Sequence, residues 1–185
     1  MEIRRDLHLK RLIDARGDGL IKIVTGVRRS GKSYLLFNIF DRWLRENGVE
    51  EERIIKVNLE DRRNKKLRDP DTLLEFIDAR IEGKGQYYVL LDEVQMVKEF
   101  EDVLNSYLNM PNVEVYVTGS NARFLSKDVV TEFRGRGHEI HIMPLTFSEF
   151  MSVYDGTKER GLDEYMTYGG LPQTVLYDSE QEKSD

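Results

Sequence analysis

Two residue groups in this sequence have types and spacings suited to phosphate chemistry. The first, Gly26-Val-Arg-Arg-Ser-Gly-Lys-Ser33, fits the pattern G-x-x-x-x-G-K-[ST]. In such a loop the glycines let the backbone wrap around phosphates, and the N–H groups of the loop and of the following helix face the negative charge. We expect Lys32 to reach the β- and γ-phosphates of a nucleotide and Ser33 to be a ligand of Mg²⁺. The predicted nucleotide-binding residues here are Gly26, Val27, Arg28, Arg29, Ser30, Gly31, Lys32, Ser33 and Tyr34.

The second group is a pair of carboxylates that follows an apolar segment. Tyr87 to Leu91 (YYVLL) is typical of a strand buried on both faces, and Asp92 and Glu93 come next. Because ligands of open α/β sheets bind at the carboxyl ends of the strands, such a strand would bring both carboxylates to the phosphate loop. We expect Asp92 to hold Mg²⁺ and Glu93 to orient and polarise the water that attacks the γ-phosphate.

Small polar residues end the next predicted strand, in the segment VYVTGSN at 115–121. We expect one of them to touch the γ-phosphate or the attacking water, and we favour Ser120 over Asn121, with Thr118 third. The alternative for the residues not used is a turn that caps the following helix.

Basic residues at two further places are candidates for binding anions. Arg134 and Arg136 precede another predicted strand and could stabilise charge on the transferring phosphoryl group, from the same subunit or a neighbouring one. Solvated turn residues are the alternative for both. The segment Arg62 to Arg68 has five basic residues in seven and could contact nucleic-acid phosphates. We favour a solvated loop there, because no aromatic side chains interleave the charges and the net charge of the chain is −6.

The elements that must position these residues alternate between strand-like and helix-like patterns. This alternation predicts a parallel sheet covered by helices on both faces, so the fold class is α/β, a three-layer α/β/α sandwich. The predicted strands are 21–25, 53–59, 87–91, 113–117 and 137–143.

Helix signals lie between the strands. An apolar stripe follows the glycine-rich loop and ends near Gly48. Asp69 before Pro70 predicts an N-cap with proline in the first helical position. Thr146 and Glu149 are spaced as a capping box that opens another helix. The N-terminal helix-forming segment is amphipathic and could lie on a membrane surface, but we favour packing against the sheet near the adenine pocket.

Composition limits the alternatives. The chain has 185 residues, a length that favours one domain. Its 28 basic and 34 acidic side chains nearly balance, which favours a folded chain over a disordered one. Zero cysteines exclude disulfides, thiolate zinc sites and cysteine nucleophiles. His138 and His141 should point to opposite faces of a strand and cannot easily share a metal. Apolar runs are far shorter than the roughly 18 residues of a membrane span, and the first residues lack a signal peptide's apolar segment, so we expect a cytoplasmic protein.

Several of these segments together resemble a known family, the predicted prokaryotic ATPases of the AAA+ superfamily that carry an N-terminal AAA domain. The matching segments are RDLHLKRLID, IVTGVRRSGKSYLL, VNLED, YVLLDEVQ, VTGSNARFLS, FRGRGHEI, MPLTFSEF and YGGLPQTVL. The resemblance implies a P-loop NTPase fold with a five-stranded parallel sheet of order 5-1-4-3-2. It also implies hydrolysis of ATP with Mg²⁺, with Lys32, Ser33, Asp92 and Glu93 in the roles given above, although no arginine finger has a secure position across that family.

The same resemblance has consequences for domain organisation. The turn from Gly169 to Pro172 looks like a Gly-Pro element that contacts bound nucleotide in related signalling ATPases, so Pro172 is a candidate sensor. The family normally continues for about as long again. We therefore expect residues 1–155 to form the ATPase core, residues 156–185 to begin a small helical lid or a linker, and a C-terminal domain to follow. Expected partners are ATP or ADP, that domain and other copies of the chain.

Two functions compete at this point. The first is an ATPase that couples its nucleotide state to a conformational change, and the second is an ATP-gated binding or regulatory module, DNA-associated in one version, with incidental hydrolysis. A GTPase fits poorly, because Asn64-Lys65 lacks an aspartate two residues later and follows the wrong strand. A P-loop kinase would usually carry a different acidic pattern at Asp92 and Glu93 and a substrate lid between strands.

Overall fold

A five-stranded parallel sheet forms the centre of the molecule. A computed structural model describes residues 2–119, 133 and 135–176 of the chain. The strand order is β2-β3-β4-β1-β5, which is the predicted order 5-1-4-3-2 counted from the opposite side. The strands are β1 (Ile21–Gly26), β2 (Ile54–Asn58), β3 (Tyr87–Asp92), β4 (Val113–Thr118) and β5 (Gly137–Ile142). The predicted α/β fold and sheet order are thus confirmed.

The strand register gathers the ends of the central strands. β1 lies between β4 and β5, with Val24 opposite Thr118 and Gly26 opposite Ile142. β3 pairs with β2, with Asp92 opposite Asn58. The carboxyl ends of the strands therefore meet at one side of the sheet, which we call the carboxyl edge. We call the opposite side, where the strands begin, the amino edge.

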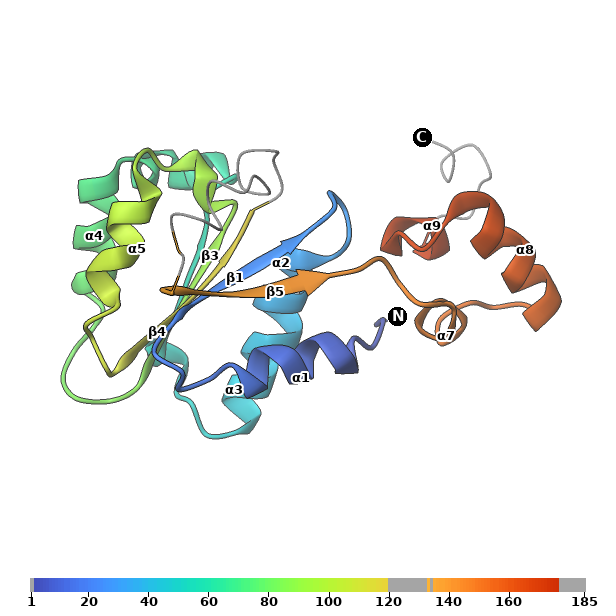
Figure 1. Cartoon of the computed structure of the whole chain (residues 1–185), viewed down its shortest axis with the longest axis horizontal. Helices are drawn as coiled ribbons and strands as arrows, with labels where there is room; N and C mark the ends of the chain where they lie inside the picture. Colours follow the sequence, from blue (N-terminus) through green and yellow to red (C-terminus); the bar gives the residue numbers. More distant parts are fainter. Residues whose placement is uncertain (1, 120–132, 134, 177–185) are drawn as a thin grey trace.

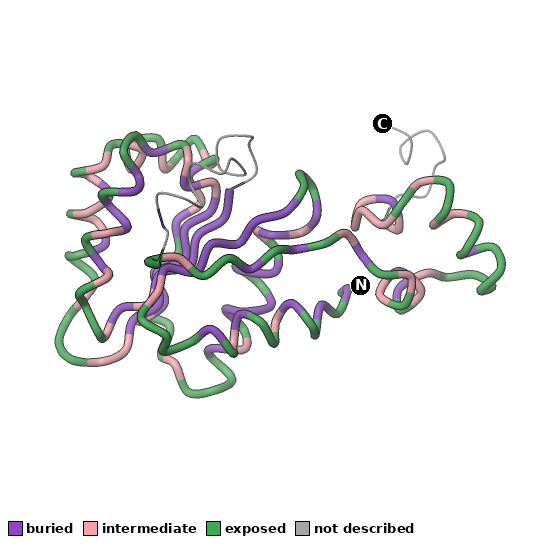
Figure 2. The backbone as a smooth tube through the Cα atoms, in the orientation of Figure 1, coloured by how far each residue is buried: buried purple, intermediate pink, exposed green. Residues whose placement is uncertain are grey.

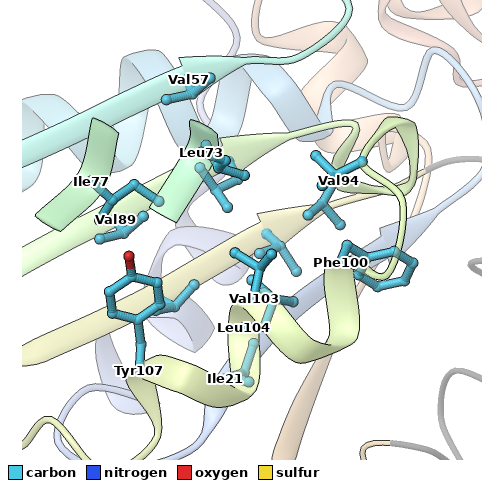
Figure 3. Close-up of a cluster of buried hydrophobic side chains, with 14 of the residues drawn as sticks. Ile21, Val57, Leu73, Ile77, Val89, Val94, Phe100, Val103, Leu104 and Tyr107 are labelled. Atoms are coloured by element: carbon cyan, nitrogen blue, oxygen red, sulfur yellow. The ribbon is translucent and has the colours of Figure 1, made fainter. Parts of the chain in front are cut away.

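Helices cover both faces of the sheet, as the alternating pattern predicted (Figure 1). α4 (Pro70–Asp78) and α5 (Phe100–Tyr107) cover one face, and their apolar side chains pack on β1, β3 and β4 (Figure 3). α1 (Asp6–Asp14), α2 (Lys32–Tyr34) and α3 (Asp41–Glu46) cover the other face. Leu12 of α1 is buried there, so the N-terminal helix packs on the sheet rather than presenting its apolar side to solvent.

The helical stretch after the glycine-rich loop differs from a uniform α-helix. A π-helical segment, η1 (Leu35–Phe40), joins α2 to α3. Four of its six residues are buried against the sheet, which is more than a single narrow helical stripe would bury. Gly48 follows α3 with a φ of 88°, a left-handed conformation that favours glycine at a helix end, as predicted.

Short helices occupy several connections, and their first turns follow the predicted capping signals. They are η2 (Glu51–Arg53), η3 (Arg62–Arg68) and η4 (Val94–Met96). The Asp69 side chain accepts a hydrogen bond from Thr72 N at the start of α4, which confirms the N-cap. The segment at 62–68, expected as a loop, forms a 3₁₀ helix because the Asp61 side chain accepts from Arg63 N and caps it.

A third group of helices follows β5 and lies beside the sheet rather than on it (Figure 1). It consists of α7 (Phe147–Met151), α8 (Lys158–Tyr168) and α9 (Pro172–Leu176), and Thr146 and Glu149 form the predicted capping box. Its own small apolar cluster is built on buried Ile3, Leu145, Phe150 and Val153. Figure 2 shows the nearly continuous burial of the central strands β1, β3 and β4 against the mixed burial of these helices. The domain boundary predicted at residue 155 stays a prediction.

Within the described part of the chain, no helix combines the length and apolar composition needed to cross a membrane.

Candidate functional site

The glycine-rich loop leaves β1 at the carboxyl edge, and its glycines have steric reasons to be glycine. Gly26 has a φ of 145°, and a Cβ atom there would lie 2.4 Å from the carbonyl oxygen of Ile142 on the neighbouring strand. Gly31, with a φ of 91°, is the N-cap of α2. Both conformations are disfavoured for residues with a Cβ atom. The loop therefore begins and ends at positions where only glycine fits without strain.

Lys32 opens α2 with its side chain buried and turned back onto the loop. Its Nζ donates to the carbonyl oxygens of Gly26, at 3.0 Å, and Val27, at 2.9 Å. Burial lowers the pKa of Lys32, and the charges of Glu93 and Asp92 oppose that shift. The ammonium group is thus held in the loop by neutral carbonyls, where an incoming anion would be a stronger partner.

Asp92 is the centre of a buried hydrogen-bond group. Its Oδ1 accepts from Ser33 Oγ at 2.7 Å and from Thr118 Oγ1 at 2.5 Å. Burial raises the pKa of this carboxyl, while the two hydroxyl donors lower it in part. The structure thus brings together Ser33 and Asp92, the two predicted ligands of Mg²⁺. A carboxylate and a hydroxyl are the hard oxygen donors that Mg²⁺ prefers, with phosphates and water as its usual remaining ligands.

Glu93 follows directly, in a left-handed conformation with a φ of 55°. Its backbone N–H donates to Thr118 Oγ1 at 3.1 Å, and its carboxylate accepts from Gln95 Nε2. The hydroxyl of Thr118 therefore links Asp92 to Glu93. Thr118 stood third among the predicted polar residues, and Gln95 was missed, although its place two residues after Glu93 in a strand-ending segment was a usable signal.

A cavity of about 830 Å³ opens at this edge. This volume lies in the range of small-molecule sites. The lining combines residues of the loop, of the segments that follow β2 and β3, of the N-terminal segment and of the stretch 145–176. The lining residues are Ile3, Arg5, Arg28, Arg29, Gly31, Lys32, Ser33, Tyr34, Glu60, Glu93, Gln95, Leu145, Pro172, Gln173 and Leu176.

Pro172 reaches the loop, as its predicted role requires. A Cβ atom on Gly31 would lie 3.6 Å from Pro172 Cγ, so the first turn of α9 sits directly against the start of α2. The structure thus places Pro172, Lys32, Ser33 and Glu93 around one cavity.

The remaining predicted residues are placed differently. Ser120 and Arg134 lie outside the described residues. Arg136 precedes β5 at the amino edge, and its Nη1 donates to Asn105 Oδ1 at 3.1 Å. Since β5 has six residues, roughly 20 Å of strand separate Arg136 from the carboxyl edge. Arg136 is therefore not among the residues that line the cavity of its own chain, and a role from a neighbouring subunit stays a prediction.

The basic residues of η3 have partly structural roles. Arg63 pairs with Asp61, and Arg68 donates to the carbonyl oxygens of Leu59 and Glu60. Arg62, Lys65 and Lys66 are exposed. The histidines of β5 also have neighbours of their own: Nδ1 of His138 lies 2.8 Å from Asp18 Oδ2, and that of His141 lies 3.0 Å from Thr25 Oγ1.

Two buried polar residues of the N-terminal segment were missed by sequence reasoning. Arg5 is 5% exposed and lines the cavity. His8, one turn further along, is also buried, and burial together with the nearby Arg5 guanidinium lowers its pKa to about 4. Neither residue is part of a recognisable motif, so only its position in the fold distinguishes it from the other charged residues of this segment.

Comparison with known proteins identifies the family of this chain. A family model described as an AAA domain matches residues 18–151. An uncharacterized protein of Haemophilus influenzae is 34% identical over 182 residues, which cover 95% of this chain and 45% of the relative. An uncharacterized protein of Methanocaldococcus jannaschii is 29% identical over 199 residues, covering 99% of this chain and 41% of the relative. The chain thus spans less than half the length of either relative.

A solved structure supports the fold independently. The Orc1 protein of Aeropyrum pernix, determined in complex with DNA, is similar with a TM-score of 0.55 at 16% identity, covering 91% of this chain and 60% of that one. Such identity is informative about the fold alone. Because the family model spans most of the chain and the sheet order is the one expected, this protein belongs to the AAA domain family and has the fold of an AAA+ P-loop ATPase domain.

Proposed function

We propose that this protein binds ATP with Mg²⁺ in the cavity at the carboxyl edge and hydrolyses it to ADP and phosphate. The observation that carries the proposal is the group around Asp92, in which the hydroxyls of Ser33 and Thr118 both donate to one buried carboxylate oxygen. Lys32 lies beside it, held by carbonyls of the loop. Few arrangements other than a phosphate and cation site place these residue types together at the end of parallel strands.

The phosphate chain would lie along the loop. We expect N–H groups of the loop and of the start of α2 to face it, and Lys32 would exchange its two carbonyl partners for β- and γ-phosphate oxygens. Ser33 and Asp92 would hold Mg²⁺, which supplies charge neutralisation between the β- and γ-phosphates when bound. The apolar lining residues Ile3, Leu145 and Leu176 suit the nucleoside end.

Glu93 is proposed to orient the attacking water and to accept its proton. Its backbone is held by Thr118, and its carboxylate by Gln95, so both contacts fix the direction of the side chain. Ser120 remains a candidate for contacting the γ-phosphate. Arg134 and Arg136 remain candidates for stabilising the transferred group, Arg136 from a neighbouring copy of the chain, because it lies at the amino edge of its own.

The wider role we propose is coupling of the nucleotide state to a conformational change, passed to the region by which the relatives exceed this chain in length. An ATP-gated binding module with incidental hydrolysis is the second candidate, and the exposed Arg62, Lys65 and Lys66 favour an anionic partner in that case.

Phosphate release and nucleotide binding, measured together, test the proposal. We expect Lys32→Ala to abolish both and Glu93→Gln to abolish release while retaining binding. Glu99→Gln is a matched control, because Glu99 is an exposed glutamate with a left-handed φ of 52° a few residues away. Undiminished release in Glu93→Gln would exclude the role given to Glu93. Binding without release in the wild-type chain would favour the second candidate or a site completed by another subunit.

A further inference from the structure

The N-terminal segment, residues 2–5, connects parts of the molecule that are far apart in sequence. The Glu2 carboxylate accepts from both terminal nitrogens of Arg42 on α3. Ile3 is 9% exposed and belongs to the apolar cluster of the third helical group. This short segment is therefore anchored on the core and on the C-terminal helices at once.

Arg5 makes the central contacts of this segment. Its Nη1 donates to the carbonyl oxygen of Ser30 in the phosphate loop at 3.3 Å, and its Nη2 donates to the carbonyl oxygen of Met143 at 2.5 Å. Its Nε lies 3.3 Å from Glu149 Oε1 in α7. One buried guanidinium group thus joins the loop, the chain leaving β5 and the first helix of the third group.

The Glu149 carboxylate that faces Arg5 also caps the N-terminus of α7. Its Oε2 accepts from Thr146 N at 2.8 Å, and Thr146 Oγ1 accepts in turn from Glu149 N at 3.2 Å, which together make the capping box. One carboxylate oxygen therefore fixes the start of the helix while the other faces Arg5. A movement of α7 relative to the phosphate loop has to change the Arg5 contacts.

The connection continues from α7 back to the nucleotide cavity. Leu145 N donates to Gly170 O at 2.6 Å, and the hydroxyl of Tyr165 donates to Leu145 O at 2.7 Å. Gly170 leads into α9, where Pro172 lies against Gly31. The contacts form a closed path from Ser30 through Arg5, α7 and α9 back to Gly31, the next residue of the same loop.

We propose that Arg5 is a positioning residue that couples occupation of the phosphate loop to the placement of residues 144–176 over the cavity. The inference rests on the proposed nucleotide binding. Phosphate bound by the loop backbone acts on the segment that carries the Ser30 carbonyl, and Arg5 passes any displacement to Met143 and Glu149. Because a buried charge is costly to leave unpaired, these contacts move together rather than separately.

Spin-label distances test the coupling directly. The chain has no cysteine, so Leu162→Cys on α8 and Glu75→Cys on α4 would carry the only labels. Adding Mg²⁺ and a non-hydrolysable ATP analogue should shift and narrow the distance distribution in the otherwise wild-type protein. In Arg5→Ala the distribution should stay broad, and the affinity for the analogue should fall about tenfold, within the usual 5- to 150-fold range of coupling between sites.

Matched variants separate this role from general charge and from folding. Arg4→Ala removes the neighbouring arginine, whose side chain is 79% exposed and pairs with Asp6, and should behave as wild type. Glu149→Gln keeps a carbonyl oxygen for the capping box but loses the charge facing Arg5, so it should lie between wild type and Arg5→Ala. If circular dichroism shows that Arg5→Ala is unfolded, Arg5→Lys replaces it in the same measurements. A lysine keeps the positive charge but cannot make all three contacts of the guanidinium group.

The outcomes distinguish this inference from the proposed function. Failure of the unsubstituted protein to bind the analogue would contradict the proposed function. Binding with no change in the label distances, or a full response in a folded Arg5 variant, would overturn the coupling by Arg5 and leave the nucleotide site in place.

Discussion

The two edges of the same sheet hold buried charge in opposite ways. At the amino edge, Lys22 of β1 is fully buried, and its Nζ lies 3.0 Å from Asp18 Oδ1 and 3.1 Å from Glu114 Oε2. The same ammonium group lies 5.4 Å from the centroid of the Tyr116 ring. This charge is neutralised by partners from the chain itself.

At the carboxyl edge, Lys32 has no ion-pair partner among the described residues. It is the first residue of α2, its Nζ donates to two carbonyl oxygens of the loop, and the buried Asp92 accepts from two hydroxyls. Within the described residues, the buried side-chain atoms without a hydrogen bond include Ser30 Oγ of the loop and Gln95 Oε1 of the cavity wall. A closed network stabilises the fold, whereas an open one leaves groups for a ligand to satisfy.

Removing Lys32 should have the largest functional effect. We expect Lys32→Ala to lower the rate of ATP hydrolysis by at least 10²-fold, as for other groups that stabilise charge in a transition state. The unfolding temperature should change little, because its partners are carbonyls that other donors or water can satisfy. Phosphate release and thermal unfolding on the same sample check both halves. A variant that hydrolyses ATP normally would remove the distinction between the edges.

Removing Lys22 should give the reverse result. Lys22→Met leaves Asp18 and Glu114 without their cation, so we expect a loss of about 3 kcal/mol in the free energy of unfolding. Hydrolysis by the folded fraction should be unchanged. Denaturant unfolding measures the loss, and Lys10→Met is the control, since its exposed pair with Asp14 should contribute less than about 1 kcal/mol. Equal stability of the two variants would contradict a structural role for Lys22.

Thr118→Val tests the link between the two carboxylates. The change is close to isosteric and removes the hydroxyl that donates to Asp92 and accepts from Glu93 N. Hydrogen bonds to charged groups contribute about 1.5–3 kcal/mol, so we expect kcat to fall about tenfold. Thr25→Val on β1 is the matched control, because that buried hydroxyl donates to Glu139 instead. Equal kcat values for both variants would rule out the linking role.

Asp92→Asn should produce the smallest change in the free energy of unfolding, and we expect that change to be stabilising. Since burial raises the pKa of Asp92 above its usual 3.8, the folded state binds this proton more tightly than the unfolded state, and stability falls as pH rises through that window. The charged carboxylate therefore costs stability at neutral pH. Asp92→Asn should unfold at a slightly higher temperature at pH 7, with the difference shrinking toward pH 4, while hydrolysis is lost. A lower unfolding temperature at pH 7 would contradict this account.

Much of the site could be predicted from local signals. The spacing of Gly26, Gly31 and Lys32 and the apolar strand ending in Asp92 are short-range patterns, and each lies on one strand and the turn that follows it. The structure places these residues around one cavity because parallel strands end at the same edge. Thr118 was only the third choice among the polar residues at the end of β4, because its role depends on a hydrogen bond to Asp92 of the neighbouring strand β3. The sequence of its own segment does not reveal that contact.

The roles of Arg5 and Lys22 could not be predicted from the sequence, and the physical reason is the same for both. Each is one basic residue among 28, and part of its environment comes from segments more than 85 positions away: Met143 and Glu149 for Arg5, and Glu114 for Lys22. The π-helical geometry of η1 was likewise not predicted, because the apolar stripe of this segment indicated only a helix.

The sequence by itself determined the α/β fold, the strand order implied by family resemblance, and the loop and carboxylates of the site. These follow from periodicity and from motifs whose chemistry needs only neighbours along the chain. The tertiary structure alone decided which buried charges are neutralised and which are left open, that Arg136 lies at the amino edge, and that Arg5 joins the loop to the C-terminal helices. Such contacts depend on distances between distant segments, and those distances exist only after the sheet has formed.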